Sequence, residues 1–589
     1  MKKPGFRRFL AGIVVLAGIT AVAAQQQTVG LFLNDDASYQ GYTLFAPIPS
    51  RVTYLIDNHG KLVHSWASDY RPGQAAYLLE SGSLLRAAQW APGPSRFNAG
   101  GQGGRIEEFA WDGTLLWEFD YSSDQVRQHH DFERLPNGNV LLIAWEYKSY
   151  AECVAAGRST AMLSDLELWP DHIVEIEPAG ASGGGIVWEW HAWDHLVQDY
   201  DPSKENYGVV TDHPELIDLN FSAVGPAGAG KADWLHINAV DYSEEFDQII
   251  LSVHNFSEIW VIDHSTTTEE AAGHTGGNSG KGGDLLYRWG NPLAYDRGVT
   301  GDQKLFLQHD SQWIESGLAG EGNILIFNNG GGRPGDDHST VDEIVPPVDE
   351  FGDYALTAGS AYGPGSAVWS YAAANPTDFY GQNTSGAQRL PGGNTLICDG
   401  PHGTFFEVTA AGQTVWRYVN PIANGGTIAQ GDPATQNGVF RAYRYGPDHA
   451  AFDGRDLMPG DPIETFTRPI PVPGGEGGTA PLSCSKIGAA GDEIHVTWDA
   501  TTCQADDYNL LFGDLDDVAG YLLQGSECAI GVSGGHDWNA VPTGDLFFLI
   551  VGVDRTVSTR AAGVMAWWVR HETPPRPPSS AASRRGTTR

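Results

Sequence analysis

The segment Gly412-Gln413-Thr414-Val415-Trp416-Arg417-Tyr418 is one copy of a phrase that recurs along the chain. Each copy combines a turn residue, one or two residues that favour strands, and two aromatic positions separated by one residue. The copies begin at Gly60, Gly113, Gly185, Asp284, Ser366 and Gly412, and His64 takes the first aromatic position of the first copy. Self-similarity over tens of residues is typical of repeat folds.

A second phrase, in which a Gly-Asn turn precedes an aliphatic run, comes before the strand in several copies. Residues 135–142 (LPNGNVLL) match residues 390–397 (LPGGNTLI), and residues 320–326 are a looser version. Gly-Asn supplies the positive φ of a hairpin turn, and the run after it is the next strand. Each repeat is therefore predicted to be a small antiparallel sheet of about four strands.

One such sheet cannot bury both of its faces, whereas six sheets arranged radially can. We therefore predict an all-β fold in which residues 28–453 form a six-bladed β-propeller. The first repeat lacks an obvious full set of strands, so the two ends of this region are expected to share one blade. A β-sandwich or an open array of sheets is the alternative.

The composition changes after residue 453. Residues 454–480 are rich in Pro and Gly and are predicted to be a linker. Strand-like runs then follow within residues 481–571, which are predicted to form a β-sandwich similar to a fibronectin type III domain. The tail, residues 572–589, has the composition of a disordered segment.

The N-terminus has the pattern of a secretory signal. Four basic residues precede an apolar run over residues 9–19, and small residues follow at 21–24. Residues 1–24 are therefore predicted to be a signal peptide, and the protein is expected to be exported to the periplasm or the extracellular space. No other apolar stretch approaches the length of about 18 residues that a membrane span needs, so no span is predicted.

Charge and cysteine content limit the partners further. Lys and Arg number 35 and Asp and Glu number 73, which gives a net charge of −38. Such an acidic surface repels phosphate backbones, so nucleic acid is excluded as a partner. The spacing of the five cysteines matches no zinc pattern. Three of them lie near the C-terminus, and a disulfide between Cys503 and Cys528 is predicted.

Histidines recur where the first strands of three successive blades begin. They are His130, His236 and His309, and His254 follows on the next strand of the His236 blade. First strands line the channel of a propeller, so these side chains are expected to converge. His402 and Arg333 are weaker candidates near other inner strands or loops.

Such a cluster has several possible chemistries. Three neutral imidazoles from different strands suit a zinc or copper ion. Hydrogen-bonding or protonated rings suit an anion such as sulfate, and one ring could act as a nucleophile. Each histidine could instead simply bond a buried strand end.

At these residues the sequence resembles the arylsulfate sulfotransferases, which are six-bladed propeller enzymes of the bacterial periplasm. The resemblance covers roughly residues 40–450, and its most specific pieces are residues 233–242 (DWLHINAVDY), 308–310 (QHD) and 327–330 (FNNG). It implies that His309 takes a sulfuryl group from a phenolic sulfate ester, forms a sulfohistidine and passes the group to an acceptor phenol. It further implies that His130 and His236 cradle the sulfate, and that neither a nucleotide sulfate donor nor any other cofactor takes part.

The sequence departs from the family at one chemical position. His254 stands where the family has an arginine beside the sulfate, and histidine carries a charge only when it is protonated. We expect His254 to share the binding of the sulfuryl oxygens with His130 and His236. Asp310, next in sequence to His309, is expected to point away from the ring because neighbouring strand residues face opposite sides.

Two other functions remain open at this point. The channel histidines could serve a metal-dependent propeller enzyme. The protein could also be a non-catalytic secreted propeller that binds carbohydrate or another protein.

Overall fold

The computed structural model describes residues 27–93, 95–221, 231–464, 483–487, 493–498, 507–514, 525–539, 541–542, 546–553 and 567–569. The chain divides into two compact units, Met1–Thr465 and Phe466–Arg589. The described residues of both units are mainly β-strands, and the first unit also carries the short helices α1 (Tyr150–Ala156) and α2 (Thr268–Ala271). The predicted all-β class is confirmed.

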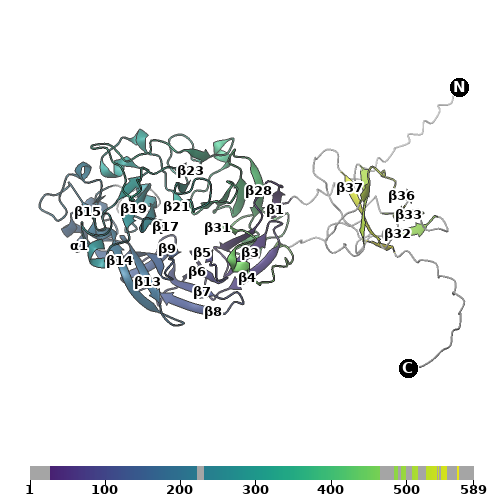
Figure 1. Cartoon of the computed structure of the whole chain (residues 1–589), viewed down its shortest axis with the longest axis horizontal. Helices are drawn as coiled ribbons and strands as arrows, with labels where there is room; N and C mark the ends of the chain where they lie inside the picture. The colour runs from purple at the N-terminus through teal and green to yellow at the C-terminus, as the bar shows by residue number, and fades with distance from the viewer. Residues whose placement is uncertain are drawn as a thin grey trace, which may run out of the picture. The chain divides into compact units, whose positions relative to one another are not determined.

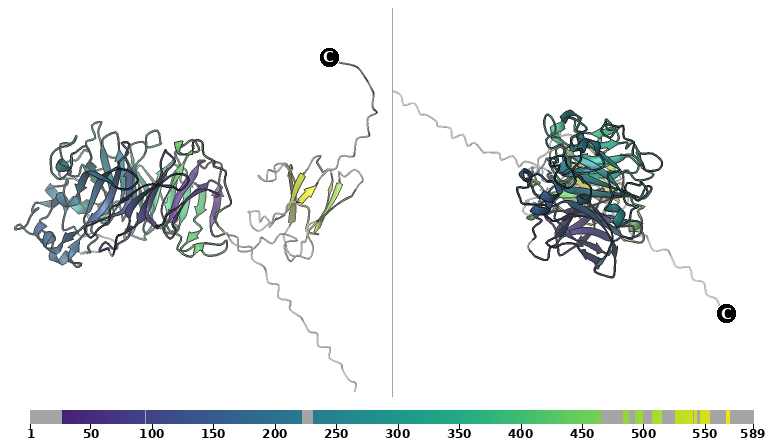
Figure 2. Two further views of the ribbon diagram at one scale, coloured as in Figure 1. Left: turned by 90° about the horizontal axis from the view of Figure 1, so that it is seen from below. Right: turned by 90° about the vertical axis from the view of Figure 1, so that its left-hand side faces the viewer.

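Six antiparallel sheets follow one another in the first unit, around a common centre (Figure 1). Seen from the side, their strands run between two loop-bearing faces (Figure 2). In order from the centre outward, the sheets are β31 (Val439–Tyr445), β2 (Tyr42–Pro47), β3 (Val52–Asp57), β4 (Leu62–Ala67); β5 (Pro72–Leu78), β6 (Leu84–Gln89), β7 (Gly104–Phe109), β8 (Leu115–Asp120); β9 (Val126–Arg134), β10 (Val140–Glu146), β13 (Asp171–Pro178), β14 (Gly184–His191); β17 (Ile237–Ser243), β18 (Gln248–Val253), β19 (Glu258–Asp263), β20 (Tyr287–Trp289); β21 (His309–Trp313), β22 (Ile324–Asn328), β23 (Thr340–Ile344), β24 (Trp369–Tyr371); and β25 (Gly386–Arg389), β26 (Thr395–Asp399), β27 (Thr404–Val408), β28 (Thr414–Val419), with β1 (Gly30–Asn34) outside β28.

The first strands of these sheets touch one another in sequence. β5 contacts β9, β9 contacts β17, β17 contacts β21, and β21 contacts β25. β31 contacts both β25 and β5, and it pairs with β2, so strands from the two ends of the unit share one sheet. Side chains on the first strands are therefore brought to one central space.

All six copies of the repeated phrase form the fourth, outermost strand of a sheet. A tryptophan in each copy donates its indole N–H to a backbone carbonyl in the next sheet, in the connection between that sheet's third and fourth strands. The last bond returns to the first sheet, so the six bonds close a circle. They run from Trp66 to Ala110 (3.1 Å), Trp117 to Gly183 (2.8 Å), Trp190 to Gly283 (2.7 Å), Trp289 to Pro364 (2.8 Å), Trp369 to Ala410 (2.9 Å) and Trp416 to Asn58 (2.9 Å).

The middle strands supply the core. Every residue of β10, β18, β19 and β22 is buried, as expected for aliphatic runs covered by a neighbouring sheet on each face. Apolar side chains of adjacent sheets form shared clusters, for example Leu142 of β10 with Ile106 of β7. The cores lie between the sheets, and polar side chains are left for the centre.

The second unit contains two antiparallel sheets. One consists of β32 (Ser483–Lys486), β33 (Glu493–Thr497) and β36 (Gly535–Asn539). The other consists of β35 (Gly525–Glu527), β34 (Asp507–Asp514), β37 (Leu546–Val553) and β38 (Trp567–Val569). Val496 and Trp538 of the first sheet share one apolar cluster with Leu510 and Phe548 of the second.

Several sequence predictions concern residues outside the described ranges. They are the signal peptide at 1–24, most of the linker, the tail at 572–589, and Cys503 of the predicted disulfide. Among the described residues, no helix has the length and the apolar character that crossing a bilayer requires.

Residues 460–464 pack on the first unit and give a testable boundary. Gly460 N–H donates to Leu62 O (2.8 Å), and Leu62 N–H donates to Asp461 O (3.2 Å). A chain ending at Thr465 should therefore keep the melting temperature of the first unit, whereas a chain ending at Arg455 should melt several degrees lower. Thermal denaturation followed by tryptophan fluorescence measures both. Equal melting temperatures for the two truncations would show that residues 456–464 contribute nothing.

Candidate active site

The histidines predicted from the sequence lie at irregular points of the first strands. His130 lies in β9, His236 immediately precedes β17, and His309 begins β21. The pairing register shifts at each of these places, so each strand carries a β-bulge there. A bulge bends the strand and redirects a side chain, which turns the histidines toward the centre.

The backbone at these bulges adopts a conformation that side chains other than glycine rarely take. His130 has φ of 52°, His236 of 55°, and Asp310, next to His309, of 55°. Such positions cost about 1–3 kcal/mol each and persist only where surrounding contacts enforce them. The recurrence of this strain at the histidines indicates that their placement serves function.

The four predicted site histidines lie in one row. Ring centroids are 4.6 Å apart for His130 and His236, 5.1 Å for His236 and His254, and 5.2 Å for His254 and His309. Phe440 of β31 closes the row into a circle, with its ring 5.9 Å from His130 and 6.4 Å from His309. The sequence analysis did not identify Phe440. We call these four histidines the histidine row.

An asparagine fixes the tautomer of His309. The amide nitrogen of Asn329 donates to the carbonyl oxygens of Gly381 (2.6 Å) and Thr384 (3.1 Å), so its Oδ1 must face His309 Nδ1, at 2.8 Å. An amide oxygen only accepts, so Nδ1 carries the proton. His309 Nε2 is therefore left with a lone pair, which is the form a nucleophile needs.

His254 is held in the same way. Asn255 donates its amide N–H groups to the carbonyls of Asp233 (3.1 Å) and Trp234 (3.2 Å), and its Oδ1 lies 2.8 Å from His254 Nδ1. Nε2 of His254 is therefore also a lone-pair acceptor in the neutral ring. This differs from the arginine-like donor expected at this position.

Carboxyl groups support the other two histidines. His236 Nδ1 lies 2.6 Å from Asp233 Oδ2. His130 Nδ1 lies 2.8 Å from Nδ1 of His129, whose Nε2 lies 2.6 Å from the fully buried Asp171. Burial, and then the charge of Asp233, hold the pKa of Asp171 well above its ordinary value, so this carboxyl keeps its proton at neutral pH.

The proton of Asp171 sets the orientation of the hydrogen bonds that end at His130. A carboxylic acid donates to His129 Nε2, which leaves the His129 proton on Nδ1. That proton points at His130 Nδ1 and thus places the His130 proton on Nε2. His130 therefore offers an N–H donor without carrying charge, whereas His254 and His309 offer lone pairs.

Burial sets the charge of the row. Burial and the neighbouring rings hold the pKa values of His130 and His309 well below the ordinary value, and they lower the pKa of His254 to about 3. These three rings are neutral at physiological pH. An anion among them would favour their protonated forms.

A buried arginine lies beside the row and connects three first strands. Arg441 of β31 pairs with Asp131 of β9 (2.6 Å) and with Asp310 of β21 (3.0 Å), and it stacks over the ring of Phe440 at 4.5 Å. Asp310 thus points away from the His309 ring, as the sequence analysis expected. Removing one member of such a buried pair typically costs 3–5 kcal/mol, so this network holds the bulges in place.

Two weaker candidates lie elsewhere. His402 is exposed and bonds to Asp399 (2.9 Å). Arg333 donates to the Thr340 hydroxyl (3.1 Å). Neither contacts the histidine row among the interactions of the described residues.

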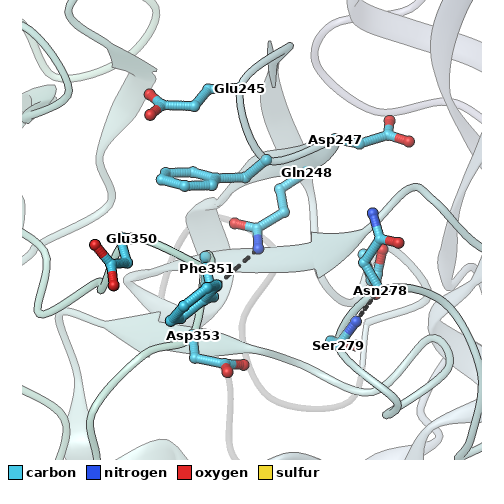
Figure 3. A pocket seen from close by; sticks show the side chains of 11 residues that line it. Glu245, Asp247, Gln248, Asn278, Ser279, Glu350, Phe351 and Asp353 are labelled. Atoms are coloured by element: carbon cyan, nitrogen blue, oxygen red, sulfur yellow. Dashed lines mark hydrogen bonds between the residues drawn. The ribbon is translucent and has the colours of Figure 1, made fainter.

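A separate cavity of about 430 Å³ lies away from the row, beside the turn between β17 and β18. Figure 3 shows acidic side chains from two loops around it, among them Glu245, Asp247, Glu350 and Asp353. Several carboxylates would repel an aryl sulfate. This cavity is therefore not the site of a sulfate ester.

The comparisons with known proteins identify a family. The sequence matches the family described as Arylsulfotransferase (ASST) over residues 50–444. No curated protein matches it. Among solved structures, it is similar to a Bacteroides caccae protein of unknown function (11% identity, 69% of this chain, 99% of that chain, TM-score 0.33). It is also similar to virginiamycin B lyase from Staphylococcus aureus (8% identity, 68% of this chain, 87% of that chain, TM-score 0.29).

The neutral state of the row predicts a pH-dependent affinity for anions. The pKa of His254 without an anion is about 3, and a bound sulfate raises it, so binding takes up a proton. The dissociation constant of inorganic sulfate should therefore fall as the pH is lowered from 8 to 5. Calorimetry in buffers of different ionisation enthalpy measures both affinity and proton uptake. Binding that is independent of pH, without proton uptake, would contradict this account.

Proposed function

The chain belongs to the arylsulfotransferase family, matched over residues 50–444, and from this premise we propose that it transfers a sulfuryl group through a covalent sulfohistidine on His309. The donor is an aryl sulfate and the acceptor is a phenol. The observation that carries the proposal is the Asn329 amide, which is anchored on two carbonyls and so leaves the lone pair of His309 on Nε2. No nucleotide sulfate donor is needed.

In the first step, His309 Nε2 attacks sulfur and the bond between sulfur and the aryl oxygen breaks. The ring then carries a sulfuryl group on Nε2 and a proton on Nδ1, and the positive charge is met by Asn329 Oδ1 at 2.8 Å. The phenolate leaves with a proton from His254, which acquires it when the anionic donor binds. His130 and His236 donate to the sulfuryl oxygens, where charge accumulates.

In the second step, the acceptor phenol gives its proton to His254 Nε2 and attacks sulfur. The bond between nitrogen and sulfur breaks, and His309 regains its lone pair. The products are the free phenol and the new aryl sulfate. His254 thus moves a proton in both steps, a role that an arginine could not fill because it does not deprotonate in proteins.

The alternative in which the row binds a metal has less support. Three ligands of one ion must come close together. Among the described residues, the one group of three possible ligands with atoms within 4.8 Å of one another is His195, His274 and Asp284, and it contains no member of the row. The non-catalytic alternative differs in having no turnover, which the assay below tests.

The proposal extends to the whole chain. The ring of contacts among six first strands supports a six-bladed β-propeller that closes between β31 and β2. The two sheets with one shared apolar cluster support a fibronectin type III-like second domain. Export through the signal at residues 1–24, with a disulfide between Cys503 and Cys528, completes the proposal.

Loss of the nucleophile gives the direct test. His309→Ala should abolish the release of phenol from a chromogenic aryl sulfate in the presence of an acceptor phenol. Brief incubation of the parent protein with donor alone should add about 80 Da, one SO₃ group, to the peptide that contains His309. His130→Ala or His236→Ala should lower the rate about 10²–10³-fold, as expected for one lost oxyanion donor.

The matched control is His402→Ala, which removes an imidazole outside the row and should behave as the parent protein does. Circular dichroism confirms that each variant is folded. Turnover by His309→Ala at the parent rate would overturn the nucleophile assignment.

Asn329 is a positioning residue whose role can be separated from folding. Asn329→Leu removes the acceptor for Nδ1–H, so the neutral ring should populate both tautomers and kcat should fall on the order of 10²–10⁴-fold. KM should change little, because the groups that hold the sulfuryl oxygens remain. The ¹⁵N chemical shifts of the His309 ring report the tautomer directly. A ring that stays fully in the Nδ1–H form in the variant would show that Asn329 does not set it.

A further inference from the structure

A second histidine cluster lies at the outer edge of the first unit, between the third and fourth sheets. His195 follows β14 in the chain, whereas His274 and Asp284 belong to the glycine-rich connection between β19 and β20. Asp284 Oδ1 lies 2.9 Å from His195 Nδ1 and 2.8 Å from His274 Nδ1. The sulfuryl-transfer proposal makes no use of these residues.

The His195 ring is completely buried and held from two sides. Its Nε2 lies 2.8 Å from the carbonyl oxygen of Ala271, and its ring is stacked on Trp190 at a centroid distance of 5.7 Å. A Cβ at Gly283 would lie 2.6 Å from Nε2, so only glycine fits there. The connection is shaped to hold this ring in one orientation.

The proton count of His195 leaves a place for a cation. A carbonyl oxygen only accepts, so Nε2 carries the proton, and the Nδ1 of a neutral ring then has a lone pair. That lone pair faces a carboxylate oxygen at 2.9 Å, and two acceptors at this distance repel each other unless a positive ion lies between them. Histidines that bind metals usually donate their other N–H to a carbonyl or a carboxylate, as His195 does.

We propose that His195, His274 and Asp284 bind a zinc-type divalent transition-metal ion, with water as a fourth ligand. Two imidazole nitrogens and one carboxylate oxygen are a known ligand set for zinc. All three ligand atoms lie within 4.8 Å of one another. Tetrahedral zinc with bonds of about 2.0–2.1 Å separates its ligands by roughly 3.3 Å.

The observed separations of 2.9 and 2.8 Å must therefore widen by about half an ångström when the ion binds. His274 can supply this movement, because its side chain is 60% exposed and lies on a loop. His195 and Asp284 are buried and stay in place.

The ion would link two sheets. Trp190 of β14 already donates to Gly283 O (2.7 Å), and Trp188 donates to the Thr266 hydroxyl (3.1 Å). A metal bond from His195 to the same connection would reinforce this contact. The site is thus structural, and it is independent of the proposed sulfuryl transfer.

The test uses the full chain, stripped with a chelator, dialysed and titrated with ZnCl₂. Calorimetry and elemental analysis should find one zinc equivalent that His274→Ala and Asp284→Asn both lose, and this zinc should raise the melting temperature. His402→Ala is the matched control, because its exposed ring also bonds to a carboxylate but has no third ligand. It should keep the equivalent.

Calcium and magnesium, which prefer oxygen ligands, should not compete with zinc. Zinc bound to the histidine row would persist in His274→Ala, so the variant separates the two sites. Failure of the parent protein to bind zinc, or an unchanged stoichiometry in both variants, would overturn the proposal. The pair His195–Asp284 would then be held together by a proton.

Discussion

The circle of six tryptophan hydrogen bonds is the constraint on which the first unit depends. A four-stranded sheet with two apolar faces is unstable in water alone, and each sheet here is packed between two neighbours. The indole N–H of each outer strand finds its acceptor only when the next sheet has the correct position along the strand direction. Each bond contributes a modest net free energy of about 0.5–1.5 kcal/mol, but their geometry sets the register between all six sheets. Apolar packing alone would leave that register less defined, because it is not directional.

The centre of the unit uses this register. The first strands meet there with bulges and left-handed residues, which the surrounding sheets enforce. Arg441 balances two carboxylates from different sheets, and the histidines above it stay neutral because they are buried. Neutral rings with fixed tautomers can treat an incoming sulfate ester in different ways. Those supported by asparagine offer lone pairs, and His130, supported through His129 by Asp171, offers a proton. One residue type thus provides the nucleophile, the proton carrier and a hydrogen-bond donor.

The sequence predicted what repeats and what clusters. The six phrases became the six outer strands, and His130, His236, His254 and His309 lie in one row because each occupies a recognisable position relative to a strand. The supporting groups could not be predicted in this way. Asn329 reaches His309 across a bulge, and Arg441 meets Asp131 at a separation of 310 residues. These contacts depend on bulge geometry and on closure between sheets, and neither leaves a periodic signal in the sequence. Asn255 follows His254 directly, yet its role depends on two carbonyls from another strand's approach.

Closure by β31 also affects when the site comes into being. This strand supplies Phe440 and Arg441, and it lies beside β2, which is made near the beginning of synthesis. Domains generally fold as units as the chain emerges, so five sheets can assemble before the last strand is available. Until residue 445 has emerged, Asp131 and Asp310 lack their arginine and the circle around the histidines stays open. A partly synthesised chain is consequently inert, and the protein gains its chemistry in a single late event of its biogenesis.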